Sequence, residues 1–312
     1  MLDIHTHLFW DRYDADRDAV IRRAREAGVR RMISVGTSPE DNPQAIALAK
    51  RYDDIYASVG LHPHFFNQLT DNKKQLTMEI EELKRLAEQK KVVAIGECGL
   101  DYYNQQPVVN SQQKTISDEE KMCQKEGFLA QIALAQELEL PIIIHTRPSL
   151  GTMDAYEDMY AVLTSHCHSE RGEESRNNTF GDVKDGIPRQ ARNDVNCILH
   201  CYQGDTEVTK KFLELPHIYF SFSGSITYPV KKSLIGTKDD SAETVKLIPL
   251  DRLFVETDCP FLAPQEKRGT RNEPAYVCFT AEAVCRIKQC SSTRLEETLE
   301  SNWGKVFGRY SF

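Results

Sequence analysis

The chain has 312 residues, of which 40% are hydrophobic, and its 39 basic and 47 acidic side chains give a net charge of −8. This length is long for one ordinary domain but suits a (β/α)₈ barrel, which typically takes about 250 residues. The negative charge excludes a global positive field that would draw the protein onto nucleic acid. A nucleic-acid substrate would therefore need local basic groups or bound cations.

The nine cysteines are expected to be reduced thiols. The chain starts at Met-Leu-Asp, with no basic or apolar leader segment that would indicate export to an oxidising compartment. No apolar run approaches the roughly 18 residues that a membrane span needs. We therefore expect a soluble, cytoplasmic protein with no membrane partner, acting as a monomer.

Short runs rich in isoleucine and valine alternate with helix-like stretches along most of the sequence. This alternation predicts an α/β protein with parallel strands and crossover helices, and eight strands suggest closure into a (β/α)₈ TIM barrel. An open, doubly wound sheet is the alternative, because periodicity does not show closure. The expected strands are Leu2–His7, Arg31–Val35, Ile55–Val59, Val92–Gly96, Pro141–His145, Cys197–His200, Ile218–Phe222 and Leu253–Thr257.

Amphipathic segments lie between the expected strands, and two more follow the last strand and would pack on the outside of the barrel as extra C-terminal helices. The expected helices are Asp14–Ala27, Pro39–Arg51, Lys74–Lys90, Asp118–Glu139, Asp205–Glu214, Pro274–Gln289 and Thr293–Trp303.

Two polar segments interrupt this pattern, at about residues 104–117 and 166–194. The first contains Gln, Asn and Pro and is expected to be a long loop. The second has few large apolar residues, so it cannot bury much core. It follows a helix and precedes a strand, which in a barrel places it at the N-terminal face, opposite the catalytic mouth. Both are interpreted as insertions in a single domain spanning residues 1–312.

Six imidazole and carboxylate side chains come at or just after expected strands. His5 and His7 are two residues apart at the end of the first strand, so both can face one ion. This pair alone is a weak indication, and the prediction depends on four more residues at strand ends that converge on one mouth in a barrel. These are Glu97, His145, His200 and Asp258.

The mixture of imidazoles and carboxylates suits Zn²⁺, Mn²⁺, Fe²⁺ or Co²⁺, and Mg²⁺ with more water ligands. Six ligands exceed the three protein ligands of a usual catalytic zinc site and indicate two divalent metal ions. Glu97 is the natural bridge between them. Asp258 is expected to bind one ion and to accept a proton from the attacking water, so Glu97 and Asp258 are the candidate catalytic residues.

Seven motifs follow one another along the chain: MLDIHTH at 1–7, GLHPH at 60–64, IGECGLDYY at 95–103, PIIIHTR at 141–147, ILHCYQG at 198–204, ETDCPFLAP at 256–264 and RNEPAYV at 271–277. In sequence and in order they resemble those of the TatD family of metal-dependent deoxyribonucleases. The resemblance covers the chain except for the two polar insertions. It implies a (β/α)₈ barrel of the amidohydrolase-like group that cleaves DNA with two divalent metals, often as a 3′-to-5′ exonuclease.

The resemblance also implies a division of the ligands. One ion would be held by His5, His7, Glu97 and Asp258, and the other by Glu97, His145 and His200. The resemblance further places His62, in GLHPH, near the metal centre and on a substrate phosphate.

Other polar and aromatic residues have two interpretations each. Arg147 could clamp a phosphate or form a salt bridge at the mouth, and Arg271, beside Lys267 and Arg268, could bind phosphate or be solvated. Asp101 and Glu256 could orient metal ligands or pair with basic side chains. Three tyrosines could stack on unpaired bases or simply pack in the fold; they are Tyr102, Tyr103 and Tyr202.

The predicted function is metal-dependent hydrolysis of phosphodiester bonds in DNA, as a 3′-to-5′ exonuclease on single-stranded ends, with duplex ends also considered. Two alternatives use the same barrel: a small-molecule ester, lactone or amide hydrolase, and a deacylase of aminoacyl-tRNA esters. Many small-molecule hydrolases of this kind bridge their metals with a carboxylated lysine where this chain has Glu97, which favours the nuclease. A non-catalytic metal-stabilised binding protein would have lost ligands, whereas all six are present.

Overall fold

The computed structural model describes residues 1–67, 73–103, 116–167, 195–229 and 241–308. Eight parallel strands are paired in chain order, from β1 to β8. The predicted (β/α)₈ fold is confirmed, and the open-sheet alternative is wrong, because the chain after β8 pairs with β1 through a bridge between Thr6 and Cys259. The strands are β1 Leu2–Thr6, β2 Arg31–Val35, β3 Ile55–Val59, β4 Val92–Asp101, β5 Ile142–Arg147, β6 Cys197–Leu199, β7 Ile218–Phe222 and β8 Leu253–Val255.

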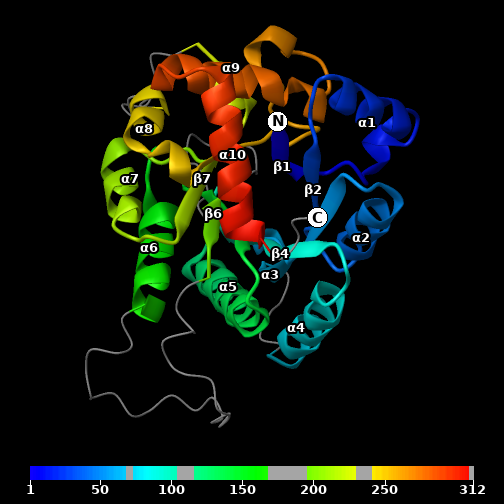
Figure 1. The fold of residues 1–312 in the computed structure, drawn as a ribbon. Coiled ribbons are helices and arrows are strands. Elements are labelled where there is room, and N and C mark those ends of the chain that lie inside the picture. The colour runs from blue at the N-terminus through cyan, green and yellow to red at the C-terminus, as the bar shows by residue number, and fades with distance from the viewer. Residues whose placement is uncertain (68–72, 104–115, 168–194, 230–240, 309–312) are drawn as a thin grey trace, which may run out of the picture.

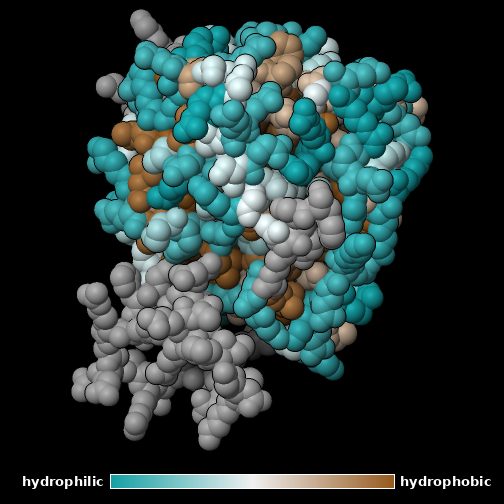
Figure 2. Space-filling model, in the orientation of Figure 1, coloured by the Kyte–Doolittle hydropathy of each residue, from teal (hydrophilic) through white to brown (hydrophobic). Residues whose placement is uncertain are grey.

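Helices surround the barrel (Figure 1). In the view of Figure 2 the outer surfaces of the two helices on the right, α1 and α2, are mostly hydrophilic, as amphipathic helices over a barrel require. The helices are α1 Arg17–Glu26, α2 Asp41–Arg51, α3 Pro63–Phe66, α4 Lys73–Ala87, α5 Asp118–Leu138, α6 Asp154–Cys167, α7 Thr206–Leu213, α8 Ser241–Leu247, α9 Val277–Lys288 and α10 Ser292–Phe307.

Helices α3 and α8 were not predicted from the sequence, and α6 was expected only as a helix without bounds before the second insertion. Strand β4 is longer than expected. The expected strand ended at Gly96, but β4 continues to Asp101 because Gly99, Leu100 and Asp101 stay paired with β5. Glu97 therefore lies inside a strand, where a register shift between Ile95 and Cys98 interrupts the pairing with β5. Such an irregularity changes the direction in which a side chain points.

Gly96, next to Glu97, has a backbone conformation that requires glycine. Its φ is +135°, and a Cβ at this position would lie 2.5 Å from the carbonyl oxygen of Ile143. Residues with a side chain are excluded there by sterics. The close approach of β4 and β5 on either side of Glu97 thus depends on this glycine.

The predicted insertions fall largely outside the described residues. Two of their expected bounds are corrected by the structure. Ser117, expected in the first insertion, caps the start of α5 through reciprocal hydrogen bonds with Glu120. The second insertion was expected to begin at residue 166, but α6 continues through Cys167. The remaining residues, 104–115 and 168–194, lie outside the described part of the chain. Within the described ranges, no helix has the length and apolar character needed to cross a bilayer.

The C-terminal helix α10 lies across the end of the barrel that faces the viewer in Figure 1. Asn302 donates hydrogen bonds to the carbonyl oxygens of Leu250 and Leu253, just before and at the start of β8. Trp303 is 1% exposed and packs against Tyr56 and Phe307. This helix therefore closes the N-terminal end of the barrel and leaves the opposite end open for a site.

Replacing Trp303 with alanine should lower the free energy of unfolding by about 3–5 kcal/mol, because it leaves a cavity under α10. Denaturant unfolding followed by circular dichroism measures this change. Trp303→Phe keeps an aromatic ring in the cavity and should lose less stability. Unfolding of the alanine variant at the wild-type denaturant concentration would contradict the packing role of this residue.

Candidate metal centre

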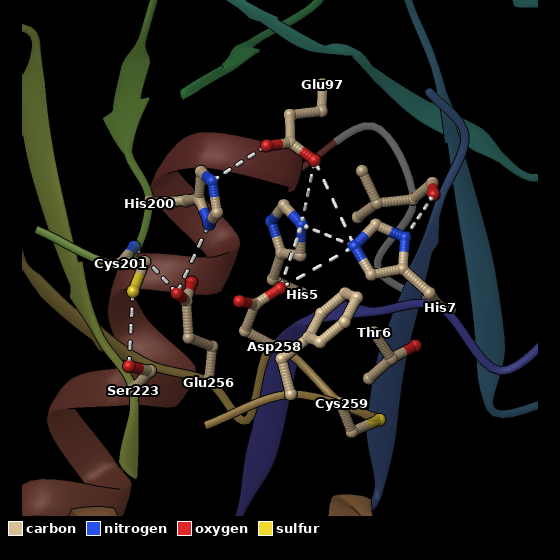
Figure 3. A network of polar contacts seen from close by, with 12 residues as sticks. His5, Thr6, His7, Glu97, His200, Cys201, Ser223, Glu256, Asp258 and Cys259 are labelled. Carbon is tan, nitrogen blue, oxygen red and sulfur yellow. Dashed lines mark hydrogen bonds and ion pairs between the residues drawn. The ribbon is translucent and has the colours of Figure 1, made fainter. Parts of the chain in front are cut away.

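All six predicted ligands meet at the C-terminal end of the barrel, and Figure 3 shows all of them except His145. His5 belongs to β1, and His7 follows it directly. The others come from β4, from β5, and from the residues just after β6 and β8; they are Glu97, His145, His200 and Asp258. Parallel strands of a barrel direct their carboxyl ends to one mouth. His5 and Asp258 thus lie side by side although they come from opposite ends of the chain.

The first set of ligand atoms surrounds one point. His5 Nε2 lies 3.3 Å from both His7 Nε2 and Glu97 Oε2. Asp258 Oδ1 lies 3.8 Å from His5 Nε2 and 3.6 Å from His7 Nε2. Atoms that bind one tetrahedral ion at about 2.0–2.2 Å lie roughly 3.3–3.6 Å from one another. His7 Nε2 lies 4.0 Å from Glu97 Oε2, so the separations run from 3.3 to 4.0 Å, slightly wider than this range. The four residues are a suitable set of donors for a divalent transition metal ion.

The second set of ligand atoms uses the other oxygen of Glu97. Oε1 lies 2.7 Å from His145 Nδ1 and 2.9 Å from His200 Nε2, and the two nitrogens are 3.3 Å apart. The two oxygens of one carboxylate thus face different groups of imidazoles. At these separations Glu97 Oε1 contacts the two nitrogens directly, and a carboxylate placed in this way is suited to bridging two ions.

One imidazole is oriented by a hydrogen bond from its far nitrogen, and two others have a carboxylate oxygen within ion-pair distance of theirs. His7 Nδ1 is 3.0 Å from the carbonyl oxygen of Val35, so Nδ1 donates and Nε2 is left as a lone pair facing the site. His200 Nδ1 is 3.4 Å from Glu256 Oε1, and His145 Nε2 is 3.3 Å from Asp101 Oδ2. These carboxylates lie where the outer partners of metal-binding histidines lie, without a hydrogen bond to either ring in this structure.

Burial and charge act in opposite directions on the two carboxylates. Burial alone would raise the pKa of Glu97, but the imidazoles of His200, His5 and His145 outweigh it and hold that pKa well below its usual range. Asp258 behaves likewise, because the hydrogen bond with His7 and the other imidazoles lower its pKa against the effect of burial. Both carboxylates are therefore ionised and ready to bind cations.

The same balance favours protonation of His145. Burial lowers its pKa, but Asp101 and Glu97 outweigh that effect and raise it to about 9. Protons on imidazoles thus compensate the buried carboxylates. Binding of a cation would displace such protons.

His62 faces the second set without being one of the predicted ligands. Its Nδ1 accepts a hydrogen bond from the backbone N–H of His64, and its Nε2 lies 3.8 Å from Glu97 Oε1. Burial and the neighbouring His145 lower the pKa of His62 to about 3, so the ring is neutral. Because Nδ1 of this neutral ring accepts a hydrogen bond, the proton is on Nε2, which is therefore a hydrogen-bond donor that faces the site.

Asp3 holds the first set together and was missed by the sequence analysis. Its carboxylate is fully buried and accepts hydrogen bonds from Thr257 N at 2.9 Å and Thr257 Oγ1 at 2.6 Å. Thr257 precedes Asp258, whose N–H donates to the carbonyl oxygen of His5. Burial raises the pKa of Asp3 to about 8. The sequence pattern that could have indicated Asp3 is an aspartate within the otherwise apolar strand that leads to the two histidines.

The two predicted phosphate-binding arginines have different surroundings. Arg147 is exposed, and its guanidinium lies 3.9 Å from the centre of the Tyr103 ring. No ion pair to Arg147 occurs in the described ranges. Arg271 donates two hydrogen bonds to Asp16 and one to the carbonyl oxygen of Arg12, and it covers the ring of Tyr13. The guanidinium of Arg271 therefore has partners within the protein.

A family model described as "TatD related DNase" matches residues 2–308. The chain belongs to this family. The "Uncharacterized metal-dependent hydrolase YabD" of Bacillus subtilis is 35% identical over 308 residues, which are 98% of each chain. The "3′-5′ ssDNA/RNA exonuclease TatD" of Erwinia tasmaniensis is 30% identical over 312 residues, 98% of this chain and 99% of that protein. The protein is thus a TatD-like metal-dependent hydrolase.

Among solved structures, the TatD homologue YjjV of Escherichia coli is similar with a TM-score of 0.74 and 24% identity, over 99% of this chain and 98% of that one. An uncharacterised amidohydrolase from Saccharomyces cerevisiae is similar with a TM-score of 0.72 and 20% identity, over 98% and 99%. These likenesses show that the TatD-family chain shares their barrel fold.

Replacing Glu97 with glutamine should remove metal from both ligand sets, because one carboxylate serves both. Glu256→Gln should weaken metal binding by roughly 10–100-fold, since Glu256 only orients His200. Metal per chain after dialysis, measured by mass spectrometry, tests both expectations. Glu243→Gln, an exposed change on α8, is the matched control. Unchanged metal content in Glu97→Gln would contradict the shared role of Glu97.

Proposed function

We propose that this chain hydrolyses phosphodiester bonds in DNA with two divalent ions, Mg²⁺, Mn²⁺ or Zn²⁺, as a 3′-to-5′ exonuclease on single-stranded ends. The observation that carries the proposal is the position of Glu97, whose Oε2 faces His5 and whose Oε1 faces His145 and His200. Two divalent ions held by these residues would activate a water and stabilise the leaving oxygen of such a displacement.

Asp258 is the proposed proton acceptor. Its side chain is 15% exposed, compared with 5% for Glu97, so it is the more accessible carboxylate of the first set. The imidazoles keep it ionised despite burial, as its lowered pKa indicates. An ionised carboxylate beside the attacking water can take its proton, which is general-base catalysis.

His62 and Arg147 are the proposed substrate contacts. The Nε2–H of His62 points into the second set and can donate to a non-bridging phosphate oxygen. The guanidinium of Arg147 at the end of β5, held on the ring of Tyr103, can pair with a phosphate of the strand. Arg271 is not retained as a substrate contact, because Asp16 already binds it.

Nucleic acid as the substrate class is supported by the name of the Erwinia tasmaniensis relative, which acts on ssDNA and RNA according to that name. The acidic chain offers little general attraction for a polyanion, so binding would depend on the ions and on the few cations at the mouth. An enzyme that cleaves from the end of a strand needs only a small contact surface with the nucleic acid, because it does not have to bind along a groove of the duplex. The expected cytoplasmic location and monomeric state stay predictions.

The deciding assay is removal and return of metal with end-labelled DNA. A chelator should abolish cleavage of single-stranded DNA labelled at its 5′ end, and Mg²⁺ or Mn²⁺ should restore it with stepwise shortening from the 3′ end. Mononucleotide products support exonuclease action; RNA and duplex DNA of the same sequence show the substrate preference. Absence of cleavage with any metal, alongside hydrolysis of a small ester, would favour a small-molecule esterase instead.

Asp258→Asn should lower kcat for DNA by roughly 10²–10⁴-fold, the usual contribution of a general base, while leaving part of the metal bound. Parallel measurements of kcat and metal content separate the two effects. Asp251→Asn, at an exposed aspartate before β8, is the matched control. Full activity of Asp258→Asn would refute the role given to this carboxylate.

A further inference from the structure

Two aromatic rings lie beside the first ligand set and have no part in the chemistry described above. Trp10 stacks on the imidazole of His7, with ring centres 4.5 Å apart and planes at 13°. Phe261 meets Trp10 edge to face at 5.5 Å and 78°. Each ring comes three residues after a proposed ligand, His7 or Asp258. The pair therefore borders the site where the scissile phosphate would lie.

The backbone beneath both rings is fixed by side chains from other elements. Arg17 donates hydrogen bonds to the carbonyl oxygens of Leu8, Phe9 and Trp10 at 2.7, 2.9 and 3.0 Å. Asn272 Nδ2 donates to the carbonyl oxygen of Phe261 at 2.6 Å. Rings held in this way present a surface that needs no ordering when a ligand binds.

The exposure of Phe261 argues against a purely structural role. Phe261 is 39% exposed, whereas two of the three tyrosines that could stack on bases according to the sequence, Tyr102 and Tyr202, are buried in the fold; the third, Tyr103, is partly buried under Arg147. A large apolar ring kept partly in water at the edge of a site indicates a binding surface. Trp10 already covers the imidazole of His7, so Phe261 is not needed for that purpose.

A cation accompanies the rings. The guanidinium of Arg12 lies 5.5 Å from the centre of the Phe261 ring, and the side chain is exposed. No ion pair involves Arg12 in the parts of the chain that the structure describes. Aromatic rings that stack on bases, combined with cations that face the backbone, are how proteins bind single-stranded nucleic acid.

We propose that Trp10 and Phe261 form a stacking surface for an unpaired nucleobase of the substrate strand, with Arg12 facing a neighbouring phosphate. This inference rests on the proposed function and names the form of DNA that the site accepts. A base inside a duplex is already stacked on both faces, so it must leave the stack to reach the rings. The surface therefore favours frayed or single-stranded ends.

Tryptophan fluorescence tests the stacking directly. The chain has two tryptophans, and Trp303 is buried under α10 at the other end of the barrel. Hydrolysis-resistant phosphorothioate oligothymidylate added to the metal-loaded protein should quench the emission of Trp10, and the Trp303→Phe variant should show the same quenching. An abasic strand of equal length should quench far less. Equal quenching by both strands, or none by either at saturation followed by anisotropy, would overturn the proposal.

Kinetics with matched variants provide the second test. Phe261→Leu keeps an apolar side chain but loses the ring, and it should raise KM for single-stranded DNA roughly tenfold, the scale of one lost base stack, with little change in kcat. On a strand with abasic 3′-terminal nucleotides, wild type and Phe261→Leu should have the same KM. Leu247→Ala on α8, at a residue 40% exposed, is the control for loss of apolar surface and should behave as wild type.

The outcomes separate this inference from the proposed function. If Phe261→Leu weakens cleavage equally on normal and abasic strands, the ring is structural and the stacking surface is refuted, although the nuclease proposal stands. If the unchanged protein cleaves no DNA with any metal, the nuclease proposal fails. The fluorescence titration then still decides whether a nucleobase stacks on these rings.

Discussion

The structure of the site depends on one buried carboxylate, that of Glu97, whose two oxygens face two groups of imidazoles. An ionised carboxylate in a barrel is strongly unfavourable unless positive charge or hydrogen bonds surround it. The imidazoles therefore have to arrive from separate strands at fixed positions. The irregular pairing of β4 and the glycine at position 96 allow this side chain to point into the barrel rather than along its wall.

The first ligand set also depends on closure of the barrel. Its members come from the two ends of the chain, and they meet because the residues after β8 pair with β1. His7 N–H donates to the carbonyl oxygen of Cys259, and Asp258 N–H donates to that of His5. Asp3 adds a side-chain link to Thr257. Asp258 itself has a φ of +55°, a conformation uncommon for residues with a side chain, which these contacts maintain. The contacts that close the barrel are thus the same contacts that position the first ligand set.

Sequence patterns were sufficient for the barrel and for the convergence of the six predicted ligands at one of its ends, because both follow from strand periodicity and from polar residues at strand ends. They were insufficient where a partner lies far along the chain. Arg271 resembles a free cation until its partner Asp16, 255 residues away, is known. The helix α6 was predictable, since Tyr156, Met159 and Leu163 recur at helical spacing and are buried. The exposure of Phe261 depends on tertiary packing that no local pattern encodes.

The charges around the site connect metal binding with substrate binding. Four carboxylates lie within or directly behind the ligand sets: Glu97, Asp101, Glu256 and Asp258. Without cations this end of the barrel would repel a phosphodiester, and the chain as a whole carries a charge of −8. The guanidiniums of Arg12 and Arg147, which form no ion pair with any residue that the structure describes, lie over aromatic rings and offer only local attraction. A phosphodiester substrate would consequently need the divalent ions for binding as well as for catalysis, which makes metal occupancy the first condition for recognition of a strand at this site.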